Sequence, residues 1–124
     1  MPSDQYLELR IYKIHHGLRD RFAVSMRAIL LPLFERHGMN VIHHGPSAHD
    51  KNSYFLIRAF SSAADRKDKL DSAFSENDWL MKHEPGIVEM IDYTGTALVP
   101  AAELIELLTE RFGPASEELS GSSE

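Results

Sequence analysis

Three of the seven histidines of this chain lie within residues 41–50, VIHHGPSAHD. Histidine suits general acid–base chemistry near neutral pH and is the commonest metal ligand. His43 and His44 are neighbours on an expected strand, so their side chains point to opposite faces and cannot hold one ion together. The same objection applies to His15 and His16 if the first expected strand extends that far.

No metal site is predicted. The histidines do not form the i, i+4 pair of a helical zinc site, and the chain has no cysteine to complete a Cys/His set. His16, His43 and His83 could meet only through the tertiary fold. We interpret the histidine-rich stretch as hairpin residues at a solvated edge.

One of His43 and His44 should face the helices that cover the sheet. A neutral imidazole in that position could act as a base or as a haem ligand. A buried histidine whose hydrogen bonds are satisfied within the core is the more frequent arrangement, and it is the interpretation we favour.

Charged residues alternate with tyrosines on the first expected strand, where Glu8 and Arg10 occur, and Arg58 falls on the third. We expect all three on the sheet face away from the helices. The favoured interpretation is an ion pair that fixes strand register or a dimer seam. The alternative is an arginine that binds the carboxylate of a ligand.

Trp79 and His83 stand four residues apart in an expected short helical turn. We expect Trp79 to anchor that turn against the sheet, because its large apolar area dominates local packing. The chain has no Gly-x-Ser-x-Gly elbow for a Ser–His–Asp centre and no glycine-rich phosphate loop.

The hydrophobic pattern predicts the elements that position these side chains. Residues 6–14 alternate as a strand does, and residues 18–37 repeat apolar side chains at helical spacing, with a kink or break at Pro32 and a left-handed cap at Gly38. After this helix we expect two strands, at 39–45 and 53–60. We then expect a helix at 62–75 capped by Ser62, and a short helical turn from Asn77 that Pro85 and Gly86 end. Residues 87–92 are ambiguous between helix and strand, and a strand at 93–99 and a helix at 101–113 follow.

This element order predicts an α+β, ferredoxin-like βαββαβ domain at 1–100 with a four-stranded antiparallel sheet, an extra C-terminal helix at 101–113 and a polar tail at 114–124. We expect the helices to cover the sheet through Leu7, Leu9 and Ile11. The opposite face would then be aromatic and would need a second copy of the chain to cover it. Its expected members are Tyr6, Tyr12, Tyr54, Leu56 and Phe60.

Four segments together resemble the NIPSNAP family, over about residues 5–100. They are LELRIY (7–12), LPLFERHGM (31–39), YFLIRAF (54–60) and Trp79 after SEND. The resemblance implies a dimeric α+β barrel, in which two ferredoxin-like sheets close face to face, and a family without a settled enzymatic activity. The mitochondrial and vesicle roles of eukaryotic members are not carried over, because the sequence shows no presequence.

Neighbours of that family include cofactor-free monooxygenases and haem-degrading enzymes, which gives an enzymatic alternative. Haem-degrading relatives use Trp, His and Asn, but the step from Trp79 to His83 is shorter than theirs and the first strand has no asparagine. Whether any reaction is catalysed stays open. The candidate catalytic residues are His43, His44, Tyr54, Trp79 and His83, and the candidate ligand-binding residues are Arg10, Tyr12, Arg58 and Trp79.

A net charge of -6 without a basic stripe argues against nucleic-acid binding. No apolar run is long enough to cross a membrane, and we expect a cytoplasmic protein. The sequence therefore predicts a homodimer that binds a small apolar or aromatic molecule, or acts as an interaction module, with no cofactor. The alternative is a cofactor-independent monooxygenase or a haem-binding or haem-degrading enzyme.

Overall fold

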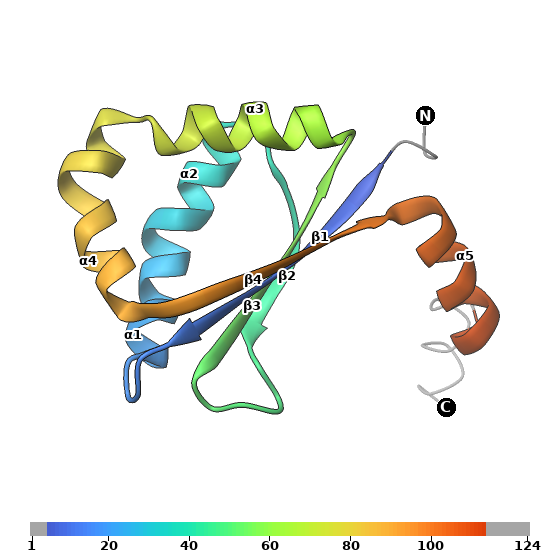
Figure 1. The fold of residues 1–124 in the computed structure, drawn as a ribbon, viewed down its shortest axis with the longest axis horizontal. Coiled ribbons are helices and arrows are strands. Elements are labelled where there is room, and N and C mark those ends of the chain that lie inside the picture. The colour runs from blue at the N-terminus through green and yellow to red at the C-terminus, as the bar shows by residue number, and fades with distance from the viewer. Residues whose placement is uncertain (1–4, 114–124) are drawn as a thin grey trace, which may run out of the picture.

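The computed structural model describes residues 5–113, so the predicted tail at 114–124 lies outside the described part of the chain. One antiparallel sheet has the strand order β2-β3-β1-β4. The strands are β1 (Tyr6–Ile14), β2 (Asn40–Pro46), β3 (Ser53–Phe60) and β4 (Ile91–Pro100). Helices α1 to α4 lie on one side of this sheet, and α5 extends away from them at the end of β4 (Figure 1). The predicted ferredoxin-like βαββαβ order is confirmed.

The first helical crossover contains a π-helical turn, η2 (Met26–Leu30), between α1 (Arg19–Ser25) and α2 (Leu31–Arg36). Pro32 lies directly after this turn. Proline has no N–H to donate and crowds the carbonyl four residues earlier, so the regular ladder is interrupted there. The expected irregularity therefore occurs just before Pro32. Gly38, at φ 73°, has the predicted left-handed conformation.

The second crossover begins with α3 (Ala63–Phe74), where the Ser62 hydroxyl accepts a hydrogen bond from the Asp65 N–H at 3.0 Å, as the predicted cap requires. It continues through a π-helical turn, η3 (Trp79–His83), into α4 (Glu84–Met90). The expectation that Pro85 ends the helix is wrong. Pro85 lies in the first turn of α4, where a missing N–H costs nothing.

The C-terminal helix α5 (Ala101–Phe112) starts directly after β4, and the Ala101 N–H donates to the Gln5 carbonyl at 2.9 Å. No described helix is both long and apolar enough to cross a membrane.

The two faces of the sheet are the reverse of our expectation. Leu9 and Ile11 are 38% and 45% exposed, whereas the aromatic face packs beneath the helices. The Phe22 ring of α1 lies 5.0 Å from the Tyr12 ring and 5.5 Å from the Tyr54 ring. The larger aromatic side chains remove more apolar area from water than the aliphatic ones. The buried residues of this face are Tyr12, Tyr54, Leu56 and Phe60, with Tyr6 partly buried.

The expected placement of Glu8, Arg10 and Arg58 on the face away from the helices is also wrong. All three lie on the helix side, where Glu8 and Arg58 are buried. Arg58 Nε donates to Glu8 Oε1 at 2.5 Å, and Arg66 Nη2 lies 2.6 Å from Glu8 Oε2. Burial alone would raise the pKa of Glu8, but the hydrogen bonds and charges of Arg58 and Arg66 outweigh it and lower the pKa. The pair thus stays ionised inside the core.

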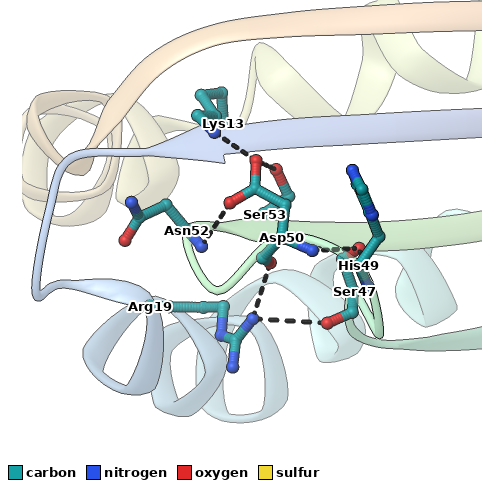
Figure 2. A network of polar contacts seen from close by, with 7 residues as sticks. All are labelled: Lys13, Arg19, Ser47, His49, Asp50, Asn52 and Ser53. Carbon is teal, nitrogen blue, oxygen red and sulfur yellow. Dashed lines mark hydrogen bonds and ion pairs between the residues drawn. The ribbon is translucent and has the colours of Figure 1, made fainter.

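A polar network fixes the loop between β2 and β3 (Figure 2). Asp50 forms an ion pair with Lys13 of β1 and accepts hydrogen bonds from the Asn52 N–H at 2.8 Å and the Ser53 hydroxyl at 2.9 Å. Arg19 of α1 donates to the Asp50 carbonyl at 2.9 Å. The end of the histidine-rich stretch is therefore a loop held by Asp50.

Arg58→Met tests the buried pair. We expect the free energy of unfolding to fall by about 3–5 kcal/mol, because Glu8 would lose its buried partner. The double variant Glu8→Leu/Arg58→Met should recover part of that loss, since only Arg66, whose side chain is 26% exposed, is then left without its partner. Denaturant unfolding measures both. Lys67→Ala is the control, because it breaks only the exposed Lys67–Asp71 pair and should leave the unfolding midpoint almost unchanged. Equal effects of Arg58→Met and Lys67→Ala would contradict this account.

Candidate functional site

A cavity of about 510 Å³ lies between the sheet and the second helical crossover. All four predicted ligand-binding residues line it, although their role in binding stays a prediction. Most of the remaining lining is apolar. The apolar side chains come from η2, α3, α4 and the start of β4: Leu30, Leu70, Phe74, Ile87, Val88 and Ile91.

Arg10 is held in the cavity wall by neutral groups. Its Nη1 donates to the Thr96 hydroxyl at 2.6 Å, and its Nη2 donates to the Thr94 hydroxyl at 3.5 Å. Its guanidinium carbon lies 5.2 Å from the centroid of the Tyr12 ring. Within residues 5–113 no carboxylate forms an ion pair with it. Its positive charge is therefore fixed in position and unneutralised.

Arg58 lies on the same face but in a different environment. Its charge is neutralised by Glu8, and its guanidinium carbon lies 4.7 Å and 5.6 Å from the ring centroids of Phe34 and Phe60. Its Nη1 donates to the Met39 sulfur at 3.6 Å. The favoured ion-pair interpretation therefore describes Arg58 with Glu8, while Arg10 takes no part in that pair.

Trp79 is 5% exposed, and its ring centroid lies 5.2 Å from that of Phe74. Its Nε1–H is buried without a hydrogen-bond partner in the described chain. A buried indole N–H usually has a partner, and leaving it unpaired costs free energy. Trp79 lines both this cavity and a hollow of about 300 Å³ beside His83, so an acceptor in either could satisfy its N–H.

The candidate catalytic residues do not form one group. His44 Nδ1 lies 2.7 Å from the Tyr54 hydroxyl, while Trp79 and His83 line a separate hollow of about 300 Å³. The cavity that contains Trp79 and Arg10 is lined by neither His44 nor Tyr54. The Trp–His–Tyr arrangement that the oxygenase alternative requires is therefore split between two places.

His43 and His44 point to opposite faces, as predicted. His43 packs on the exposed face, 5.2 Å from the Phe55 ring centroid, and His44 stacks at 6.0 Å on Tyr54. Burial lowers the pKa of His44, with smaller contributions from His43 and Arg27. Residues 5–113 contain no group of three His, Asp or Glu side chains placed to hold a metal ion.

Sequence reasoning missed Thr94 and Thr96 as members of the site. Both lie on the helix-facing side of β4, with Thr96 directly opposite Arg10 and Thr94 opposite Tyr12. Their alternation around Gly95 is visible in YTGTALV, but only the strand register shows that they meet Arg10.

The fold is that of NIPSNAP family proteins. No protein-family model and no curated protein matches the chain. A NIPSNAP family protein of unknown function from Agrobacterium tumefaciens is 21% identical, with a TM-score of 0.71 over 80% of this chain and 90% of that chain. A NIPSNAP domain protein from Burkholderia xenovorans is 19% identical, with a TM-score of 0.69 over 78% of this chain and 95% of that chain.

A more distant likeness extends to an oxygenase. SnoaB, a cofactor-independent oxygenase from Streptomyces nogalater, is 18% identical, with a TM-score of 0.55 over 81% of this chain and 95% of that chain. At these identities the likenesses establish the fold and not the activity.

Glu76, at the rim of the hollow that His83 lines, provides a test of stability against pH. Arg36 Nη2 lies 2.9 Å from one carboxylate oxygen, and His37 Nε2 lies 2.5 Å from the other. The hydrogen bond from Arg36, followed by that from His37, lowers the pKa of Glu76 from 4.5 to about 2.

A carboxyl whose pKa is lower in the folded state stabilises the fold above its unfolded pKa, and loses that effect as pH falls. We therefore expect the melting temperature to decline between pH 4.5 and about 2, and Glu76→Gln to flatten that part of the decline. Thermal unfolding across this range measures the effect. Lys82→Gln, which removes the exposed Lys82–Asp78 pair, is the control. Parallel pH profiles for wild type and Glu76→Gln would refute the assignment.

Proposed function

We propose that the protein is a homodimer that binds a small, largely apolar or aromatic molecule in the cavity between its sheet and its second helical crossover. The observation that carries the proposal is this cavity of about 510 Å³, whose largely apolar lining includes Trp79 and the guanidinium of Arg10. Concave apolar sites with a few fixed polar groups are typical of small-molecule binding.

The uncovered sheet face supports the homodimer. Leu9 and Ile11 of β1 are exposed, and their cross-strand partners on β3 are Ile57 and Phe55. A contiguous apolar surface of this kind usually contacts a partner, and a two-fold dimer is the commonest way to cover it. The aliphatic face, and not the aromatic one, is therefore the proposed dimer surface.

The other candidate functions have less support. The likeness to SnoaB favours a cofactor-independent oxygenase, but Trp79 is separated from the His44–Tyr54 pair. For the haem alternative, His43 lies on the proposed dimer surface, and the hydrogen bond between Nδ1 of His44 and Tyr54 leaves only Nε2 as a possible iron ligand. An interaction module would use the exposed sheet face and would leave the cavity without a role. The cytoplasmic location stays a prediction.

Ligand binding can be measured through Trp79, because it is the chain's only tryptophan and lines the cavity. We expect naphthalene-sized aromatic molecules to change its fluorescence saturably at micromolar to millimolar concentration. Val88→Phe, at an exposed position of the lining, should weaken this binding about tenfold by filling space without disturbing the core. If no aromatic molecule of a tested set binds saturably, the proposed ligand binding is contradicted.

The dimer is tested by Ile11→Arg, which places a charge on the proposed dimer surface. We expect sedimentation to show dimers for the wild type at micromolar concentration and monomers for the variant, because a buried unpaired charge is costly. Val24→Arg, at an equally exposed apolar position on α1, is the matched control and should remain dimeric. A monomeric wild type would overturn the proposed homodimer.

A further inference from the structure

Two arginines line the same cavity, and within residues 5–113 only one of them is paired with a carboxylate. Arg58 is paired with Glu8, whereas Arg10 contacts two threonine hydroxyls and an aromatic ring in the described chain. A guanidinium has five N–H donors in a planar fork, so the two bonds to Thr94 and Thr96 leave three donors free. A fork of this kind matches the two oxygens of a carboxylate.

Two exposed hydrogen bonds to β4 orient Arg10 before any ligand arrives. Thr96 lies directly opposite it in the strand register, so its hydroxyl is carried by the sheet and not by a mobile loop. The Tyr12 ring supports the guanidinium from the same strand. Such preorganisation reduces the conformational entropy that binding would otherwise cost. Arg10 therefore has the features of an anchor for an anion.

Trp79, which carries a second donor, lines the same cavity and also the hollow beside His83. The Nε1–H of Trp79 is buried and has no partner in residues 5–113. Acceptor oxygens on a molecule bound in this cavity would pair with the free donors of Arg10.

The acidic side chains of the lining limit where an anion can lie. Asp71 is paired with Lys67 at 2.6 Å. Glu84, at the start of α4, forms no ion pair in the described chain, so its charge opposes an anionic ligand within the same cavity. An anion held by Arg10 should therefore bind more tightly when the charge of Glu84 is removed.

We propose that the ligand of this cavity is an aromatic carboxylate, with its carboxylate bound by Arg10 and its ring against the apolar wall. Arg10 is the binding residue, and Thr94 and Thr96 are positioning residues. This inference rests on the proposed function, since it requires that the cavity binds a small molecule.

The test compares three probes of similar size: 1-naphthoate, 1-naphthamide and (1-naphthyl)methylammonium. Titration calorimetry and Trp79 fluorescence give their dissociation constants for the full chain. We expect 1-naphthoate to bind at least about tenfold more tightly than 1-naphthamide, because hydrogen bonds between charged partners are stronger than those to a neutral amide. We expect the ammonium to bind most weakly.

Single substitutions show which residues cause the preference for the carboxylate over the amide. Arg10→Gln should reduce the ratio of carboxylate to amide affinity to near one, and Thr96→Val should reduce it partly. Glu84→Gln should increase it severalfold. Arg27→Gln, an exposed arginine outside the cavity lining, is the matched control and should leave the ratio unchanged. Similar melting temperatures confirm that each variant is folded. If Arg10→Gln is unstable, the effect of Glu84→Gln on the affinity ratio still tests the carboxylate inference.

The outcomes separate the two proposals. If none of the three probes binds, the proposed function itself fails. If the amide binds as well as the carboxylate, or if Arg10→Gln leaves the preference intact, the cavity binds ligands but the carboxylate inference is overturned.

Discussion

The buried ion pair between Glu8 and Arg58 is the constraint on which the arrangement of this protein depends. Burying two opposite charges beneath helices costs much free energy unless the charges form an ion pair with each other, as Glu8 and Arg58 do. Arg66 provides Glu8 with a second cation. The pair joins β1 to β3 at directly opposed positions. A shift of one residue would place one charge on each face of the sheet, so the pair specifies both the register and the face that the helices cover.

This constraint explains what the sequence could and could not predict. Period-two alternation in residues 6–14 and helical periodicity in residues 18–37 identify the elements, because each pattern depends only on local geometry. The choice of face depends on a comparison between two apolar surfaces. The side with Leu9 and Ile11 has only one charged residue on β1, Lys13 near its end, so its pattern predicts the interior. The side with Tyr12 contains charges, and its burial becomes favourable only when Glu8 meets a residue 50 positions away.

The candidate site shows the same limit. Arg10, Tyr12, Arg58 and Trp79 were predicted as ligand-binding residues, and they line one cavity. The sequence could not divide the arginines into a neutralised one and an unneutralised one, since that depends on which carboxylate lies within reach of each. The sequence also could not assign Thr94 and Thr96 to the site, because their contact with Arg10 is set by the register of β1 with β4. The error at Pro85 was local in origin, because proline ends helices and also begins them.

Because of the two π-helical turns, the side chains that line the cavity depend on the exact number of residues in each helical crossover. η2 ends at Leu30 and η3 begins at Trp79, and both residues line the cavity. Each π turn accommodates one residue more than an α-helical turn, so loss of a single residue there would regularise the helix and rotate the side chains beyond it by about 100°. Single-residue insertions and deletions in the crossovers would therefore exchange the side chains that face the cavity, while the strands and their pairing remain as they are.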